Sequence, residues 1–351
     1  MKNQKPDRGG SNRAPFRPEG GDPDSWADEE TRASAFADER LRKRFRRLPG
    51  EVHDRIGGGI PQACQDWAAV KAAYRFLSNP KVSAAGILAG HSEATRARFQ
   101  AAPGTVLILH DTTEFVFQRE SAAGFGLLTR TRLGDGREFM VRGLLMHSSM
   151  AVTLDGVPLG LASVQFRSRQ RFKDANAPER RANPTRVPIE EKESHRWLEN
   201  LRESGRLLGN PERQVHIGDR ESDIYELFCT AQSEHTHFLV RTCVDRLAGE
   251  GGRTVAEAMQ KPDGSGSHTL FFDAGDGRVE EAWLDVRWRR LRILPPVGWR
   301  ARWPELELTV IHATERGAPA EREPIDWKLL TSEHARIPWT GKSKTPIHTQ
   351  P

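Results

Sequence analysis

Residues 25–100 carry apolar positions at helical spacing. The stretch "SWADEETRASAFADERLRKRFRRL" begins with Ser25 as a cap before acidic residues in the first turn, which predicts a helix start. The stretch "QDWAAVKAAYRFLSNPKVSAAGILAGHSEATRARF" predicts two helices separated by a turn at Asn79-Pro80, with Ser83 capping the second. The pattern therefore predicts a helical domain near the start of the chain.

After Pro103 the period becomes that of strands. "TVLILHDTTEFVF" has an apolar run before Asp111, and "EFMVRGLLMHSSMAVTL" and "VPLGLASVQFRSR" predict two more strands joined by a hairpin at "LDGVP". A helix ending at Gly209, the strand "RQVHIGD", the helix "RESDIYELFCTAQ" and the strand "HFLVRTC" follow. Three strands followed by this alternation predict an α/β (α+β) fold, a mixed sheet with flanking helices. The RNase H-like fold is one that fits.

The pattern of apolar residues and turns changes twice in the last third of the chain. Gly-rich turns separate strand-like runs in residues 246–320, which predicts a β insertion, and "DWKLLTS" returns to the pattern of a core strand. Both ends of the chain lack an apolar period, which predicts disorder. The predicted organisation is a leader (1–24), a helical domain (25–100), a core (101–245), the insertion (246–320), a last core strand (321–332) and an unrelated tail (333–351).

Composition narrows the class of protein. Charged residues make up 29% and hydrophobic residues 36% of the 351, with a formal net charge of +5, which allows an anionic partner without requiring one. Three cysteines without a C-x-x-C pair argue against a disulfide framework or a zinc site and fit a reducing cytoplasm. No apolar run is long enough to span a membrane, and the N-terminus does not resemble a signal peptide. The sequence predicts a cytoplasmic globular protein.

Two aspartates follow short apolar runs, Asp111 after "VLILH" and Asp219 after "VHIG". If the two strands are neighbours, both carboxylates meet at one sheet edge, where hard oxygen ligands suit Mg²⁺ or Mn²⁺ and phosphoryl transfer. An aspartate after a strand is also ordinary turn or cap chemistry, so the pattern leaves both interpretations open. In "GDRESD", Asp223 is expected to be a first-turn acid or helix cap, and Arg220 to pair with Asp219 or contact a phosphate.

Five stretches in this order, "DWAAVKAAYRFLSNPKVSAAGI", "HDTTEF", "GDRESDIYELF", "HFLVRT" and "DWKLLTS", resemble bacterial DDE transposases of the transposon-five type, in the insertion-sequence-four family. The resemblance covers roughly residues 25–332. It implies a helical DNA-binding domain, an RNase H-like catalytic core with a β insertion, and a C-terminal dimerisation region. It also implies a nucleoid-associated protein that binds double-stranded DNA at inverted transposon ends as a dimer. Such a protein cleaves and joins strands with two Mg²⁺ ions.

The same resemblance assigns roles in the core. Asp111 and Asp219 match the first two catalytic carboxylates and metal ligands. Arg241 matches a basic residue near the cleaved strand, with Arg220 as a further expected DNA contact. Trp327 matches an aromatic residue that stacks on a flipped base, although without the resemblance a core tryptophan is the simpler interpretation.

Three arginines match basic positions of the end-binding domain: Arg40, Arg44 and Arg75. Arg40 and Arg44 lie four residues apart on one helix face, as phosphate contacts require. From composition alone, the "RLRKRFRR" stretch predicts only a solvated helix face. The resemblance reverses that preference.

The sequence departs from the family after "LLTS". The family continues into a helix spaced Y-x2-R-x3-E-x6-K that holds the third carboxylate, but here Pro338 and Pro346 would interrupt a helix, and Glu333 follows Leu330 too closely to occupy one. We therefore expect a C-terminally truncated transposase with no third catalytic carboxylate, weakened Mg²⁺ binding and no dimerisation region. An apolar face is expected where that helix would pack.

Three hypotheses follow. The first is a cut-and-paste transposase by descent that is defective in transposition. The second is a DNA-binding remnant that occupies transposon ends and inhibits an intact transposase. The third is a metal-dependent nuclease of relaxed activity.

Overall fold

The structure is a computed structural model, and it describes residues 23–36, 38–117, 126–132, 138–168, 189, 192–250, 252–273, 278–320 and 322–333. All but two residues of the predicted leader and all but Glu333 of the predicted tail lie outside this part of the chain, as do Pro338 and Pro346. Contacts divide the chain into two compact units, Met1–Ala94 and Thr95–Pro351.

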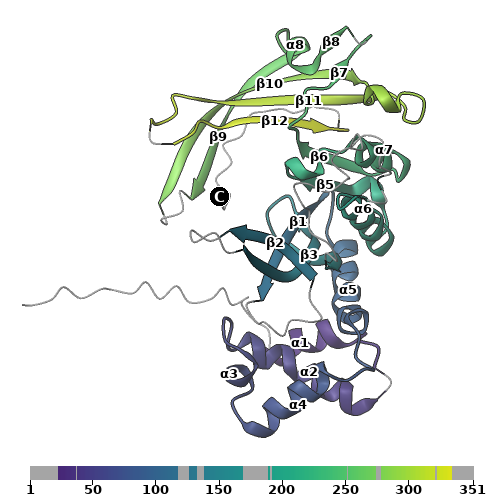
Figure 1. The fold of residues 1–351 in the computed structure, drawn as a ribbon, viewed down its shortest axis with the longest axis vertical. Coiled ribbons are helices and arrows are strands. Elements are labelled where there is room, and N and C mark those ends of the chain that lie inside the picture. Colours follow the sequence, from purple (N-terminus) through teal and green to yellow (C-terminus); the bar gives the residue numbers. More distant parts are fainter. Residues whose placement is uncertain are drawn as a thin grey trace, which may run out of the picture. The chain divides into compact units, whose positions relative to one another are not determined.

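The first unit is helical (Figure 1). Its elements are α1 (Pro23–Thr31), α2 (Glu39–His53), α3 (Ile60–Cys64), α4 (Trp67–Leu77) and most of α5 (Ala84–Ala101). The prediction of one helix starting at Ser25 is wrong, because the chain breaks after Thr31 and restarts where the Asp38 carboxylate accepts a hydrogen bond from the Arg40 backbone N–H at 2.8 Å. The predicted break between α4 and α5 is confirmed, with the Ser83 hydroxyl accepting from the Gly86 N–H at 3.0 Å.

Aromatic packing holds the helices of this unit together. Phe36, Phe45 and Phe76 are buried against one another, with ring centroids 5.4–5.6 Å apart. Helices α1 and α5 approach closely at Gly90, where a Cβ would lie 2.2 Å from the Glu30 carbonyl oxygen. Only glycine permits this approach without moving a backbone.

The second unit is built on one twelve-stranded mixed sheet of the described residues. Its strands are β1 (Val106–Phe117), β2 (Gly126–Arg132), β3 (Glu138–Thr153), β4 (Pro158–Arg167), β5 (Gln214–Gly218), β6 (His237–Arg241), β7 (Leu247–Ala248), β8 (Arg253–Thr254), β9 (Gly264–Asp273), β10 (Val279–Ile293), β11 (Leu306–Arg316) and β12 (Asp326–Thr331). The helices are α6 (His195–Leu208), α7 (Tyr225–Ser233) and α8 (Val255–Ala258).

The strand order is β2-β3-β1-β5-β6-β12-β11-β10-β7-β8, with β4 also on β3 and β9 also on β10. Strand β1 is antiparallel to β3 and parallel to β5, and β5 is parallel to β6. The predicted mixed sheet with flanking helices is confirmed, and α6 and α7 lie beside β5 and β6 (Figure 1).

The sequence did not predict strand β2. The insertion strands continue the core sheet, because β12 joins β6 to β11 and carries the core sheet into β10. Asp111 does not end its strand, since β1 continues to Phe117 and pairs with β3 over its whole length. Only the parallel pairing of β1 with β5 stops near Asp111, at Leu109.

The two faces of the central strands differ in cover. Val106 and Ile108 of β1 are buried with Phe99 from the end of α5 and Leu208 from α6, so helices cover this face. On the opposite face Leu109, Ile217 and Leu239 follow one another in register across β1, β5 and β6, and all three are only half-buried. The central sheet therefore has one packed face and one partly open apolar face.

The close approach at Gly90 predicts a stability effect. Gly90→Ala should lower the free energy of unfolding by about 1–3 kcal/mol, because the added methyl overlaps the Glu30 carbonyl. Gly50→Ala is the matched control: it lies inside α2 with nothing within 4 Å of its Cβ, so it should gain about 0.5–1 kcal/mol from helix propensity. Urea unfolding of the full chain, followed by helical circular dichroism, measures both. Equal effects would contradict the close approach.

Candidate functional site

The pairing of β1 with β5 brings Asp111 and Asp219 level with each other. Its register ends at Leu109↔Ile217, and each aspartate lies two residues further along its chain. Neighbouring strands lie about 4.8 Å apart, and side chains two residues apart share a face. Both carboxylates are exposed and lie on the partly open face. The register thus brings Asp111 of β1 and Asp219, which directly follows β5, to about the same height on one face.

Arg241 extends this row onto the next strand. Gly218 pairs with Val240, so Arg241 of β6 lies level with Asp219. Burial, together with the nearby Arg220 guanidinium, lowers the pKa of Arg241, while the Asp219 and Asp326 carboxylates act in the opposite direction. Two guanidinium groups and the Asp219 carboxylate are therefore close enough to influence one another.

Trp327 lies on the same face, one strand further. Leu329 of β12 pairs with Arg241, and Trp327 precedes Leu329 by two residues. Its indole is half-buried and packs against a cluster from the insertion strands that includes Phe272, Leu284 and Ile311. Trp327 therefore shares a face with the carboxylates and also belongs to the edge of an apolar core.

The turn that carries Asp219 is tightly held. The Asp219 Oδ1 accepts a hydrogen bond from the Glu221 N–H at 2.9 Å, and the Ser222 hydroxyl donates to the Asp219 carbonyl at 2.7 Å. Gly218 has no room for a side chain, since a Cβ there would lie 2.2 Å from the Ser222 hydroxyl oxygen. The carboxylate is therefore presented by a turn with little freedom.

The buried Arg196 contacts the segments that carry both aspartates from the helix-covered face of the sheet. Arg196 of α6 donates through Nε to the Thr112 hydroxyl at 3.3 Å and through Nη2 to the Glu221 carboxylate at 2.5 Å. Thr112 follows Asp111 directly, and Glu221 lies two residues after Asp219. One guanidinium thus links the backbone segments that carry both aspartates.

Three histidines lie on the helix-covered face directly behind the carboxylates, and sequence reasoning missed them; His147 and His216 are buried and His110 is half-buried. His110 Nε2 and His216 Nδ1 share a hydrogen bond of 2.7 Å, and His147 Nδ1 bonds the Thr112 hydroxyl at 2.8 Å. Trp197 of α6 packs on His147, with ring centroids 4.5 Å apart. The available signal was strand alternation, which puts His110 on the same face as the buried Val106 and Ile108.

Burial keeps these imidazoles neutral. It lowers the pKa of His110 and of His147 to about 3, and moves the pKa of His216 well below its usual value, with the neighbouring His110 as a second cause. The three imidazoles behind the acidic site are therefore uncharged around neutral pH.

Asp223 is not a cap of α7, contrary to expectation. Ile224 occupies that position, and the Asp223 side chain is 1% exposed. Its carboxylate pairs with Arg246 at 2.6 Å and accepts from the Thr242 hydroxyl and the Cys243 and Val244 N–H groups. Asp223 therefore fixes the loop after β6, the strand that carries Arg241.

The described residues contain no group of three or more His, Cys, Asp or Glu side chains placed to hold a metal ion. Glu333 lies at the opposite end of the central strands from Asp111 and Asp219. Its carboxylate pairs with His237 Nδ1 at 3.1 Å, at the start of β6. Asp111 and Asp219 nevertheless fit a hard divalent cation as two ligands, being exposed oxygen donors on adjacent strands.

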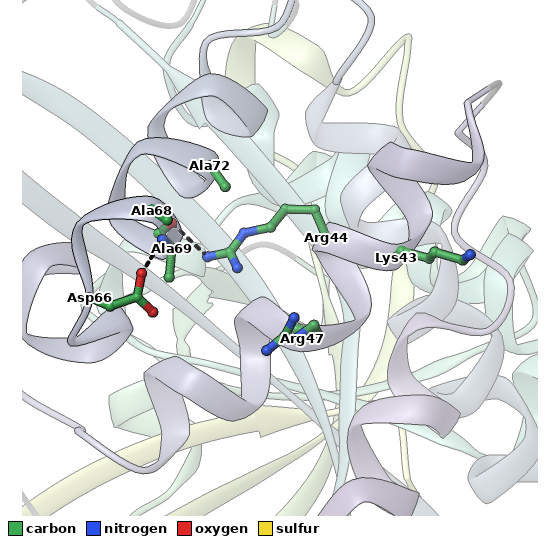
Figure 2. A pocket seen from close by; sticks show the side chains of 7 residues that line it. All are labelled: Lys43, Arg44, Arg47, Asp66, Ala68, Ala69 and Ala72. Carbon is green, nitrogen blue, oxygen red and sulfur yellow. Dashed lines mark hydrogen bonds between the residues drawn. The ribbon is translucent and has the colours of Figure 1, made fainter.

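The three predicted DNA contacts of the first unit have different surroundings. Arg40 on α2 and Arg75 on α4 are exposed. Arg44 is 13% exposed and donates to Glu51 at 2.8 and 3.2 Å and to the Ala69 carbonyl at 3.1 Å. Figure 2 shows the Arg44 side chain reaching from α2 to Ala69. Arg44 therefore ties α2 to α4.

Residues 23–82 match the family model described as transposase DNA-binding. The matched range contains α1 to α4 and ends just before α5 begins. The match supports a transposase, with DNA as a partner of the first unit. Within the described residues, no helix has the length and apolarity needed to cross a membrane.

The Asp223 contacts predict a large stability effect. Asp223→Ala should lower the free energy of unfolding by about 3–5 kcal/mol, because Arg246, 8% exposed, would keep a buried charge without its partner. Asp285→Ala breaks the exposed pair with Arg316 and should cost no more than about 1 kcal/mol. Denaturant unfolding of the full chain compares the two. Similar losses would contradict the structural role of Asp223.

The neutral histidines predict acid sensitivity. His147 has a folded-state pKa of about 3 and an unfolded value near 6.5, so only the unfolded chain takes up its proton as the pH falls below about 6.5. Between pH 7 and 5 this one residue should remove about 2 kcal/mol of stability.

His147→Gln should show a correspondingly smaller loss of unfolding free energy between pH 7 and 5. His235→Gln, at an exposed position, should leave the wild-type loss unchanged. Denaturant unfolding curves at pH 7 and pH 5 measure this loss of unfolding free energy for each variant. A His147→Gln chain with the full wild-type pH dependence would contradict the assignment.

Proposed function

We propose that this chain is a DNA transposase of the cut-and-paste type, which binds transposon inverted-repeat ends and acts on them by metal-dependent strand cleavage and transfer. The observation that carries the proposal is the row formed by Asp111 of β1, Asp219 directly after β5, and Arg241 of β6. The match of residues 23–82 to a transposase DNA-binding family supports it from the other unit.

The proposed roles follow from the row. Asp111 and Asp219 would hold Mg²⁺, which supplies charge neutralisation at phosphate and a more acidic water or hydroxyl. Arg241 and Arg220, beside Asp219, supply positive charge for a phosphodiester next to the carboxylates. Trp327 offers an indole on the same face for a base to stack on. Arg196, Gly218 and Ser222 hold the carboxylate-bearing segments in place.

The second candidate is DNA binding without cleavage, in which the chain occupies transposon ends and inhibits an intact transposase. The position of Glu333 favours it. This first acidic residue after β12 pairs with His237 at the opposite end of the sheet from Asp111 and Asp219. Cleavage activity separates the candidates, because both require DNA binding.

A nicking experiment tests the proposal. The full chain is incubated with Mg²⁺ or Mn²⁺ and a duplex carrying the inverted repeat that flanks its gene. We expect single-strand nicks at the repeat end, reduced by about 10²–10³-fold in Asp111→Asn and in Asp219→Asn, the scale of losing one electrostatic catalytic group.

Asp155→Asn is the matched control. Asp155 lies in the exposed turn between β3 and β4, at the end of β1 remote from Asp111, and its substitution should leave nicking unchanged. Binding without nicking by the wild type would replace the proposal with the second candidate. Nicking that survives both substitutions would exclude these carboxylates.

A further inference from the structure

We propose that a DNA backbone follows a cationic stripe on α2 formed by Arg40, Lys43 and Arg47, beside an alanine-lined hollow against α4, and that Arg44 is a structural residue of this surface. This inference rests on the proposed function, since it assigns the phosphate contacts of the DNA-binding unit. Lys43 and Arg47 are the new members.

Ion pairing separates the basic residues of α2 into two sets. Arg42 pairs with Glu39, Arg46 with Asp28 and Arg44 with Glu51. Within the described part of the chain, the side chains of Arg40, Lys43 and Arg47 are exposed and have no hydrogen bond or ion pair. Since no carboxylate of the described residues forms an ion pair with them, these three charges remain available to an anion.

The unpaired set lies on one side of the helix. Positions 40, 43 and 47 are separated by three and four residues, so their side chains form one stripe. At a rise of 1.5 Å per residue, about 10 Å of helix separates the first from the last. An extended row of cations suits a row of phosphates better than a single small anion.

The surface beside the stripe is a hollow whose α4 wall is formed mainly by alanine side chains. A hollow of about 400 Å³ is lined by Lys43, Arg44 and Arg47 of α2 and by Asp66, Ala68, Ala69 and Ala72 at α4 (Figure 2). Alanines let a sugar-phosphate backbone approach the helix closely. Lys71 and Arg75 follow Ala68 and Ala72 by three residues each, and both are exposed. Basic side chains are therefore present on both helices that border the hollow.

Arg44 forms part of the wall of the hollow, but its charge is already paired within the protein. Its guanidinium bonds Glu51, the Cys64 sulfur and the Ala69 carbonyl. Asp66 is the opposing charge at the hollow. One of its oxygens accepts from the Ala69 N–H at 2.8 Å as the cap of α4. A phosphate backbone is therefore expected to lie nearer Lys43 and Arg47 than Asp66.

Salt-dependent binding tests the stripe. The full chain is titrated with a 30-base-pair duplex of mixed sequence, which reports phosphate contacts without base recognition, over a range of monovalent salt. Lys43→Gln combined with Arg47→Gln should reduce the slope of log K against log salt by about 2, and the affinity by about 50-fold at 0.1 M salt. Glutamine retains helix propensity.

Arg42→Gln combined with Arg46→Gln is the matched control. It removes the same formal charge from the same helix at paired positions, and should leave the slope unchanged. Asp66→Asn keeps a cap for α4 while removing the negative charge, and should strengthen binding. Arg44→Gln should lower the urea midpoint of unfolding of the full chain, because it leaves Glu51 without its partner.

The outcomes distinguish failure of the stripe from failure of the proposed function. If the Lys43/Arg47 variant binds with the wild-type slope, the stripe is excluded while DNA binding by the chain stands. If both double variants lower the slope equally, the helix acts only through net charge and the stripe is again excluded. If the wild type shows no salt-dependent binding to duplex DNA, the proposed function fails together with the stripe.

Discussion

Strands β1 and β5 pair in parallel from Val106↔Gln214 to Leu109↔Ile217, and the candidate site depends on this register. A shift of one residue would turn either Asp111 or Asp219 to the helix-covered face. A shift of two would separate the carboxylates along the strands. The register is secured by the core behind it, where Ile108 is fully buried and His110 bonds His216 across the two strands. Interior packing on one face therefore sets the geometry of charged groups on the other.

The two faces of the central sheet differ in the charged and polar groups that they carry. One carries neutral histidines, Trp197 and the guanidinium of Arg196, enclosed by α6. The other carries Asp111, Asp219 and Arg241 among half-buried aliphatic side chains. Uncharged imidazoles behind the carboxylates let polar groups be buried without adding a fixed negative or positive charge beneath the site. Arg196 is the exception, and its charge is matched by Glu221.

The same distinction between compensated and uncompensated charge applies in the first unit. Six basic residues of α2 look alike in sequence, yet Arg42, Arg44 and Arg46 have carboxylate partners, and Arg44 also binds the backbone of α4. A paired guanidinium stabilises the helix packing. An unpaired one on the surface has most to gain from a phosphate, because no existing interaction is lost.

The sequence determined much of the local structure: the turn at Asn79-Pro80, the end of α6 at Gly209, the apolar run that begins β1, and the aspartates that follow two apolar runs. These are properties of neighbouring residues, so period and turn chemistry reveal them. Only the tertiary structure decided which strands are adjacent, that the insertion extends the core sheet, that Asp223 fixes a loop, and that Arg44 is held by Glu51. The break between α1 and α2 was also missed, because the packing of Phe36 against Phe45 and Phe76 is non-local. Each of these depends on residues distant in the chain, and their pairing follows from burial and charge compensation that exist only once the chain is folded.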